Sequence, residues 1–179
     1  MSVRNISTTG ASAATARQDR LPAGVASSEA MAERDGRYIQ AYKEIIHEVG
    51  RELNIGPSLI AAIISRESRG GTALKEGWGD NGNAFGLMQI DKRWHTPRGA
   101  WNSKEHVGQA TNILCDFIRS SDNPFRHHPD QGLKAAIAAY NAGFKRMSKN
   151  YNEIDNHTTG QDYSNDVVAR AQYFERNGL

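Results

Sequence analysis

Glu67 is the residue whose position in the sequence points most directly to chemistry. It follows isoleucines at positions 60, 63 and 64 with the spacing that puts all four side chains on one face of a helix. An apolar environment disfavours the charged form of a carboxyl group and so raises its pKa, and such a carboxyl can act as a general acid near neutral pH. This pattern alone leaves open the alternative that Glu67 is an exposed helix end paired with Arg66 or Arg69.

Two aspartates follow Glu67 in a stretch that is punctuated by glycines at positions 77, 79, 82 and 86. Because glycine has no side chain, the backbone of such a stretch can approach a ligand closely, and it carries Asp80 and Asp91. A carboxylic acid beside further carboxylates can cleave a glycosidic bond, and in an inverting mechanism the second carboxylate activates water. Each aspartate also has a simpler explanation, since Asp80 can belong to a tight turn and Asp91 can pair with Lys92 or Arg93.

Other arrangements of reactive side chains are incomplete. His47 lacks the second histidine of a metalloprotease helix, and His127-His128 has no evident third ligand, so we expect no metal and no cofactor. No glycine loop with a lysine is present to cradle a phosphate, and no basic run with interleaved aromatics indicates nucleic-acid binding. Cys115, the single cysteine, lies in an apolar helical stripe, which is more typical of core packing than of a nucleophile.

The composition is that of an ordinary globular domain. The 179 residues are 38% hydrophobic and 23% charged, which suffices for one core without disulfides. The longest apolar run, residues 59–64, is far shorter than the roughly 20 residues of a membrane span. A net charge of +2 is weak support for an anionic partner such as bacterial wall. The first residues contain no apolar core of a secretory signal, so we expect a cytoplasmic protein or export by an unconventional route.

Helices must position the three carboxyl groups, and the apolar periodicity predicts where those helices run. The small, polar and aperiodic residues at the start predict a flexible N-terminal lead-in over 1–27 and a folded domain over 28–179. Helices are predicted over 28–53, 57–68, 102–121, from 129 onward and over 162–176, with Gly56-Pro57 between the first two and Asn102 capping the third. The fold class is therefore mainly α, a single domain of several helices with a small β-hairpin or loop insertion around residues 77–91.

Five segments together resemble the goose-type lysozymes in their order and approximate spacing. They are Ile64-Ser65-Arg66-Glu67-Ser68, Gly77-Trp78-Gly79-Asp80, the stretch from Phe85 to Arg93, Ala139-Tyr140-Asn141-Ala142-Gly143 and the stretch from Tyr163 to Tyr173. The resemblance runs from about Thr8 to the end of the sequence. Related lytic transglycosylases share several of these motifs, so it is the whole set that carries the resemblance.

The resemblance implies an α+β lysozyme-like fold and a muramidase that hydrolyses the β-1,4 bond between N-acetylmuramic acid and N-acetylglucosamine in bacterial peptidoglycan, as part of antibacterial defence. It places Glu67 on the family's catalytic acid, and Asp80 and Asp91 on aspartates that position or activate the water. The positions that line the sugar cleft in the family correspond to His95, Phe117, Tyr140, Asn141 and Tyr163. Core packing is the alternative for Phe117 and Tyr140, because helical stripes already account for both.

Two features separate the chain from the bird members of that family, whose cysteines form disulfides. Ala13 and Asn54 stand at two of the cysteine positions, and without a visible signal peptide the chain resembles the signal-less, cysteine-poor members known from fish. We expect a monomer that acts on peptidoglycan and chitin-like oligosaccharides. A lytic transglycosylase and a non-catalytic peptidoglycan-binding module are the alternatives, and Asp80 and Asp91 favour hydrolysis because a hydrolase must hold a water molecule.

Overall fold

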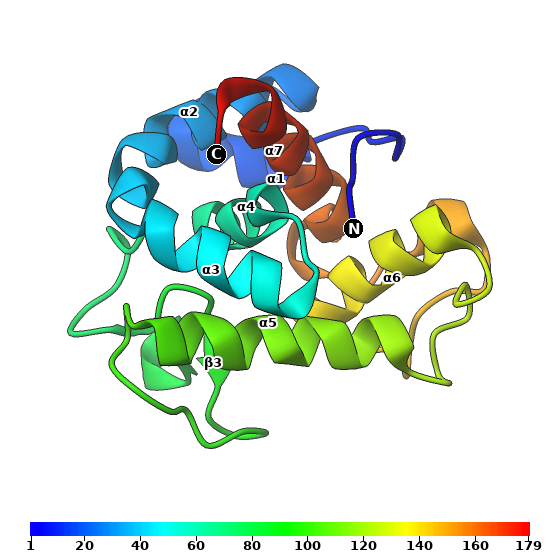
Figure 1. Cartoon of the computed structure of the whole chain (residues 1–179). Helices are drawn as coiled ribbons and strands as arrows, with labels where there is room; N and C mark the ends of the chain where they lie inside the picture. The colour runs from blue at the N-terminus through cyan, green and yellow to red at the C-terminus, as the bar shows by residue number, and fades with distance from the viewer.

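Helix α4 (Pro57–Ser68) runs through the centre of the computed structural model, which describes residues 1 to 179 (Figure 1). Nine of its twelve residues are buried, as the nearly continuous apolar sequence predicts. Pro57 occupies the first turn, where a missing backbone N–H leaves no helical hydrogen bond unmade. The helix ends at Arg69, which adopts the left-handed conformation (φ 54°) that glycine usually takes at this position. The last turn of α4, which carries Glu67, is therefore anchored in the core.

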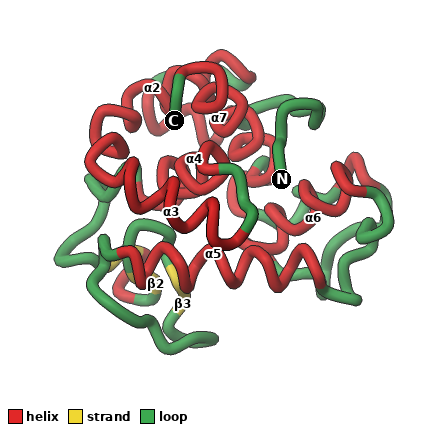
Figure 2. Tube along the Cα trace, viewed as in Figure 1, coloured by secondary structure: helices red, strands yellow, loops and turns green.

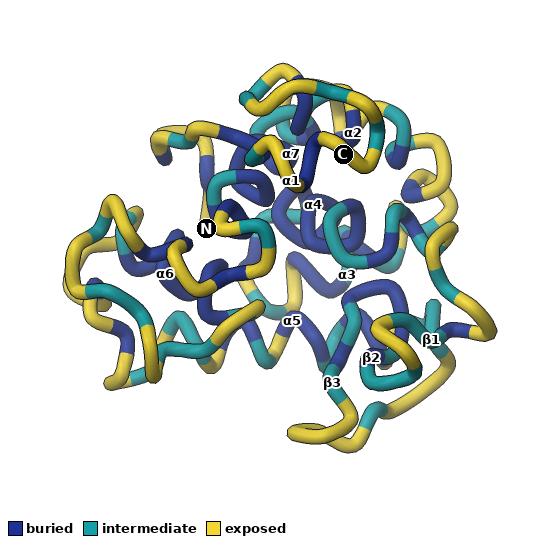
Figure 3. The backbone as a smooth tube through the Cα atoms, turned by 180° about the vertical axis from the view of Figure 1, so that it is seen from behind, coloured by how far each residue is buried: buried dark blue, intermediate teal, exposed yellow.

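Five further helices surround α4, and each buries one face against it or against a neighbour. They are α2 (Val25–Ile39), α3 (Lys43–Leu53), α5 (Lys104–Arg119), α6 (Pro129–Ala142) and α7 (Tyr163–Asn177). The most extensive packing is between α4 and α7, and α2 covers both of these helices. On the other side, α3 packs on α4 and α5, and α5 packs on α6. Seen from behind, α4 is almost entirely buried and the exposed residues collect in the outer loops (Figure 3).

The predicted single helix over 28–53 is wrong, because the chain bends in its middle. Helix α2 ends at Ile39, a 3-10 turn (η2, Gln40–Tyr42) follows, and α3 begins at Lys43. Ile39 and Ile46 are both fully buried, yet α2 packs on α7 whereas α3 packs on α5. One straight helix cannot reach both partners, so tertiary packing overrides the continuous periodicity of this segment.

Three two-residue strands form the β insertion predicted around residues 77–91. They are β1 (Trp78–Gly79), β2 (Ala84–Phe85) and β3 (Ile90–Asp91), joined in the antiparallel order β1-β2-β3. A 3-10 turn (η3, Asp80–Gly82) connects the first two strands. Figure 2 shows these strands beside α5, at the end of the molecule away from α2 and α7. The fold-class prediction is confirmed: the chain is a single, mostly helical domain with a small antiparallel sheet.

The start of α5 differs from the predicted cap at Asn102. Ser103 is the N-cap residue, and its hydroxyl accepts a hydrogen bond from the backbone N–H of His106 at 3.2 Å. Asn102 and Glu105 have the spacing of a capping box, but the extended backbone that a cap requires (φ −88°, ψ 161°) falls at Ser103. The helix therefore begins at Lys104.

The residues before α2 run along the body of the protein and include a short helix, α1 (Ala13–Ala16), followed by a 3-10 turn (η1, Arg17–Asp19). Val3 and Ile6 belong to the main hydrophobic core. The Gln172 side chain donates a hydrogen bond to the carbonyl of Ile6 at 2.7 Å, and the Lys134 ammonium donates one to the carbonyl of Ser7 at 2.9 Å. These contacts come from α7 and α6, so the lead-in is tied to two helices; its flexibility in solution stays a prediction.

None of the helices is both long enough and apolar enough to cross a membrane. No group of three or more histidine, cysteine, aspartate or glutamate side chains is arranged to hold a metal ion. Cys115 is 5% exposed and belongs to the main core, as its place in an apolar stripe predicts. Burial raises the pKa of its thiol, which makes the reactive thiolate less accessible at neutral pH.

Candidate active site

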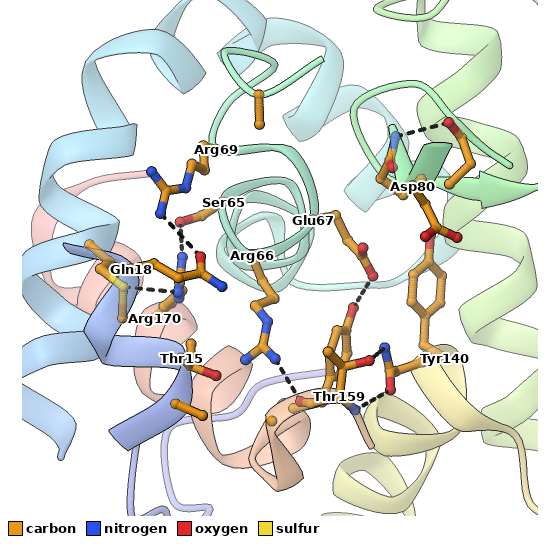
Figure 4. Close-up of a pocket in the computed structure, with 18 of the residues that line it drawn as sticks. Thr15, Gln18, Ser65, Arg66, Glu67, Arg69, Asp80, Tyr140, Thr159 and Arg170 are labelled. Carbon is orange, nitrogen blue, oxygen red and sulfur yellow. Dashed lines mark hydrogen bonds between the residues drawn. The ribbon is translucent and has the colours of Figure 1, made fainter. Parts of the chain in front are cut away.

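Glu67 lies in the last turn of α4, where its carboxyl group opens into a cavity of about 670 Å³. The phenol of Tyr163 donates a hydrogen bond to Glu67 Oε1 at 2.7 Å, drawn as a dashed line in Figure 4. Burial raises the pKa of Glu67 to about 7, although the Tyr163 hydrogen bond and the charge of Arg66 oppose the increase. The charge of Asp80 adds to it. A carboxyl group with this pKa carries a proton for a substantial part of the time near neutral pH.

The alternative in which Glu67 pairs with a neighbouring arginine is not what the structure contains. Arg66 is bound instead to Asp162 and Asp166, and Arg69 is bound to Asp19. These pairs belong to one series in which carboxylates and guanidinium groups alternate, from the buried pairs of Arg66 to the partly exposed Arg34 and Arg69. The series is Asp162, Arg66, Asp166, Arg170, Asp35, Arg34, Asp19 and Arg69. The arginines beside Glu67 are therefore occupied elsewhere, which leaves the carboxyl free to keep its proton.

The two aspartates lie on the sheet side of the same cavity, and Arg93 joins them. The guanidinium group of Arg93 contacts Asp91 at 2.7 Å and lies 3.7 Å from Asp80. Hydrogen bonds from Arg93 lower the pKa of Asp91, so this carboxyl is ionised when Glu67 is still protonated. Asp80 begins the η3 turn with a positive φ of 49°, a strained conformation for a residue with a side chain. Asp80 thus belongs to a tight turn and Asp91 to an ion pair, as the simpler explanations predicted, and both residues also line the cavity.

A second cavity of about 470 Å³ continues from the first and shares four lining residues with it. The shared residues are Gln89, Asp91, Tyr140 and Asn141. All eight predicted site residues line one or both cavities: Glu67, Asp80 and Tyr163 the first, Asp91, Tyr140 and Asn141 both, and His95 and Phe117 the second. The structure therefore brings the whole predicted set into one cleft.

Aromatic side chains give the second cavity its apolar character. Phe117 packs edge-to-face against Phe144, with ring centroids 5.5 Å apart. Tyr140 donates a hydrogen bond from its phenol to the carbonyl of Met88 at 2.6 Å. Phe117 and Tyr140 also pack against the main core, so the packing role and the position in the cleft coexist. Trp94 stands at the opening of this cavity with 81% of its surface exposed.

A buried histidine holds the glycine-rich loop that carries the aspartates. The Nε2 atom of His106 accepts a hydrogen bond from the backbone N–H of Met88 at 3.0 Å. Burial lowers the pKa of His106 to about 4, so the ring is neutral and able to accept this bond. Gly86, with φ 81°, lies so close that a Cβ atom there would be 2.3 Å from the ring. The loop can approach His106 only because residue 86 is glycine.

Several residues of the site carry no pattern that sequence analysis could use. The sequence indicates Arg93 only as a surface partner of Asp91, and Arg66 only as a partner of Glu67. His106 contacts Met88, 18 positions away, and nothing in either sequence segment pairs them. Trp94 and Phe144 have the one available signal, since aromatic residues flank the motifs at 85–93 and 139–143. That signal marks Trp94 and Phe144 only as neighbours of the motifs. Their positions in the second cavity follow from the tertiary structure.

A buried carboxylic acid with a raised pKa, across a cleft from a carboxylate with a lowered one, is an arrangement suited to a glycoside hydrolase. The profile of the family described as "Lysozyme g" matches residues 1–178. A lysozyme G of Dromaius novaehollandiae is 52% identical over 178 residues, which cover 98% of this chain and 87% of the relative. A lysozyme g of Cyprinus carpio is 52% identical over 97% of this chain and 94% of its own, and that of Takifugu rubripes is 51% identical over 98% and 96%. The chain belongs to the lysozyme g family.

Proposed function

We propose that this lysozyme g hydrolyses the β-1,4 bond between N-acetylmuramic acid and N-acetylglucosamine in peptidoglycan, with Glu67 as the general acid and inversion at the anomeric carbon. The observation that carries the mechanism is the position of a buried carboxyl, Glu67, in one cleft with Asp91, whose carboxylate pairs with Arg93. Burial raises the pKa of Glu67 to about 7, whereas Arg93 lowers that of Asp91. Two carboxyl groups whose surroundings push their pKa values apart are suited to acid and base roles in the same reaction.

The proposed reaction transfers one proton at each end and consumes one water molecule. Glu67 gives its proton to the glycosidic oxygen as the bond to the anomeric carbon breaks. Water attacks that carbon from the opposite face and releases a proton to Asp91 or Asp80. Arg93 contacts both aspartates, so it fixes their carboxylates relative to each other while they hold the water. The inverting outcome requires a gap between acid and base wide enough for this water.

The second cavity is proposed to bind the sugar rings on one side of the cleaved bond. Phe117, Tyr140 and His95 offer ring faces to the apolar patches of the sugars, and Asn141 offers an amide to an N-acetyl group. Tyr163 remains in the first cavity, where its phenol contacts the catalytic acid. The same residues would accept chitin-like oligosaccharides, which share the N-acetyl groups and the β-1,4 linkage.

Mass spectrometry of fragments released from purified peptidoglycan tests this function. A reducing muramic acid end means that water was the nucleophile, as proposed. An anhydro-muramic end means that the muramic 6-hydroxyl attacked, which would make the enzyme a lytic transglycosylase and remove the aspartates from the mechanism. Binding without release of sugar, unchanged in Glu67→Gln, would indicate a peptidoglycan-binding module. The anomer first formed, followed by NMR on a chitin oligosaccharide, decides between inversion and retention.

The finer assignment, to the cysteine-poor kind of lysozyme g known from fish, is also a proposal. It is supported by the presence of one cysteine and by alanine and asparagine at positions 13 and 54. The identities themselves do not separate the groups, because the bird and carp relatives are equally similar at 52%. With this assignment we propose a monomeric enzyme of antibacterial defence whose activity is unaffected by thiol reductants, which an assay with and without dithiothreitol can check.

A further inference from the structure

Arg66 stands directly beside the catalytic acid in the sequence, yet its side chain is directed away from it. The Arg66 side chain is 10% exposed, and its guanidinium group makes three hydrogen bonds: to Asp166 Oδ2 at 2.7 Å, to the Thr159 carbonyl at 2.9 Å and to Asp162 Oδ1 at 3.1 Å. Figure 4 shows Arg66 and Glu67 leaving the end of α4 in different directions, Arg66 toward Thr159 and Glu67 toward the side of Asp80. Arg66 thus binds the segment that leads into α7, and Glu67, the next residue of α4, faces the cavity.

The first consequence concerns Tyr163. The guanidinium carbon of Arg66 lies 5.1 Å from the centre of the Tyr163 ring, and the phenol of the same ring donates to Glu67 Oε1 at 2.7 Å. Tyr163 is therefore held on its face by Arg66 and at its hydroxyl by Glu67. With the phenol donating to Oε1, that oxygen serves as the acceptor and Oε2 is left to carry and deliver the proton of the neutral acid.

The second consequence concerns the amide that is proposed to contact sugar. Thr159, whose carbonyl accepts from Arg66, donates its backbone N–H to Asn141 Oδ1 at 2.9 Å. Asn141 in turn donates its side-chain N–H to the hydroxyl of Thr159 at 3.3 Å. A single guanidinium group therefore reaches both the partner of the acid and the loop that orients Asn141. A lysine would not satisfy three acceptors with the same fixed geometry.

The ion pairs of Arg66 also affect the protonation of Glu67. An arginine free to bind Glu67 would hold the carboxylate ionised and remove the proton that catalysis needs. Although burial disfavours its charged form, Asp166 and Asp162 raise the pKa of Arg66 and so keep it cationic in its own pair of carboxylates. The remaining field of Arg66 lowers the pKa of Glu67 only in part, and burial still raises it to about 7.

We propose that Arg66 is a positioning residue: bound by Asp162 and Asp166 and thereby kept from Glu67, it fixes Tyr163 against the catalytic acid and fixes Thr159 against Asn141. This inference rests on the proposed role of Glu67. It assigns to the Arg66-Asp162-Asp166 cluster a function in proton delivery in addition to its structural contacts.

The test compares Arg66→Met, Arg66→Lys and Asp162→Asn, with Arg170→Met as the matched control. Arg170 shares Asp166 with Arg66 but contacts Ser65 and Met31 instead of Thr159 and Tyr163. For each variant, kcat and KM on a chitin oligosaccharide are measured across pH, together with Tm. Glu67→Gln is assayed in parallel.

Arg66→Met is expected to lower kcat about 10–100-fold, since a small displacement of a positioned acid has effects of this size. Loss of a nearby cation and of the Tyr163 contact both raise the pKa of Glu67, so the alkaline limb of the profile moves to higher pH. Arg66→Lys, which keeps the charge, returns the limb to the wild-type position and recovers kcat in part. Asp162→Asn leaves Arg66 less neutralised, so the limb moves the opposite way, to lower pH.

Arg170→Met is expected to lower Tm and to leave the alkaline limb of the pH profile at its wild-type position. The inference is overturned if Arg66→Met, like Arg170→Met, lowers Tm but changes neither kcat nor the alkaline limb. It is also overturned if Arg66→Met and Asp162→Asn move the alkaline limb in the same direction. Should Arg66→Met fail to fold, Arg66→Lys and Asp162→Asn still give the two opposing results. An active Glu67→Gln would instead refute the proposed acid, whatever the Arg66 variants do.

Discussion

The two walls of the cleft hold their carboxyl groups in opposite ways. The helical wall (Arg66, Glu67 and Tyr163) is built from the end of α4 and the start of α7, and its polar groups are bound to partners inside the protein. The sheet wall (Asp80, Asp91 and Arg93) is built from short strands and a turn, and the Asp80 and Arg93 side chains are more than half exposed. Burial favours the protonated form of Glu67, whereas Arg93 favours the ionised form of Asp91 on a wall that solvent can reach.

The two walls also contribute differently to the stability of the folded protein. Removing one partner of a buried ion pair commonly costs about 3–5 kcal/mol because a charge is left unpaired in the interior. Exposed pairs contribute little, since water screens them. Substitutions in the helical wall should therefore change both folding and chemistry, and substitutions in the sheet wall should change chemistry with little effect on folding.

Glu67→Gln is expected to have the largest effect on activity. The amide keeps the shape of the side chain but cannot deliver a proton, so kcat should fall by about 10³-fold or more while oligosaccharide binding persists. Glu44→Gln, an exposed change on α3, is the matched control and should behave as wild type. Turnover within tenfold of wild type would show that the helical wall does not supply the acid.

The double variant Asp80→Asn with Asp91→Asn should come next. Loss of both groups that handle water is expected to lower kcat about 10²-fold or more, and each single change should cost less because the other aspartate remains. Hydrolysis rates on an oligosaccharide give all three values. An undiminished rate in the double variant would remove both aspartates from the mechanism.

The two walls should control opposite limbs of the pH profile. Tyr163→Phe removes a hydrogen bond that opposes the raised pKa of Glu67, so the alkaline limb should move up by about one pH unit. Arg93→Met removes the groups that lower the pKa of Asp91, so the acid limb should also move up and the profile should narrow. Profiles of kcat/KM report both limbs. If either variant moves the other limb, the acid and base assignments are exchanged.

Stability should reveal the raised pKa of Glu67 without any substrate. Its folded-state pKa of about 7 exceeds the ordinary value of 4.5. The folded protein therefore loses stability as pH rises between these values, because the carboxyl is ionised in the unfolded chain and still protonated in the folded one. Glu67→Gln should therefore be more stable than wild type by about 1–3 kcal/mol above pH 7, and the gain should vanish near pH 4. Denaturant unfolding at pH 4 and pH 8 measures it. A gain of equal size at both pH values would mean that burial does not perturb this carboxyl.

The smallest effect is expected at the rim of the second cavity. Trp94→Ala removes an exposed ring from the opening, so KM for a long oligosaccharide should rise a few-fold while kcat and Tm hold. A steady-state comparison of a short and a long chitin oligosaccharide locates the contact. Equal KM values for wild type and variant on both substrates would exclude Trp94 from the cleft's function.

Local patterns in the sequence predict the parts of this molecule that depend on neighbouring residues alone. The continuous apolar run at 59–64 predicted α4, and the glycine spacing predicted the insertion that contains the sheet. The apolar stripe across 39–49 did not reveal the bend at η2, because the two halves pack on different helices and periodicity carries no information about partners. The cap at Ser103 was missed for a related reason. Asn102 and Ser103 are both residue types that cap helices, and only the backbone conformation shows that Ser103 is the cap.

The site followed the same division. Glu67 could be singled out from its isoleucine face and Asp80 and Asp91 from the glycine-rich stretch, whereas the five sugar-cleft residues came from the family resemblance. The diversion of Arg66 into Asp162 and Asp166, and the support of Met88 by His106, depend on pairs that lie 18 to 100 positions apart. Such pairs follow from the tertiary fold, so one sequence without its structure cannot contain them.

The distance along the chain between α4 and α7 has a consequence for how the enzyme is made. Tyr163 lies 96 residues after Glu67, and Asp166 lies 100 residues after Arg66, so a ribosome emits both aspartates of the sheet wall long before these partners exist. Domains tend to acquire structure as they emerge, but the acid can be oriented only after α7 has been synthesised and has docked. Chains that stop early would therefore contain Glu67, Asp80 and Asp91 and still be unable to cut a cell wall.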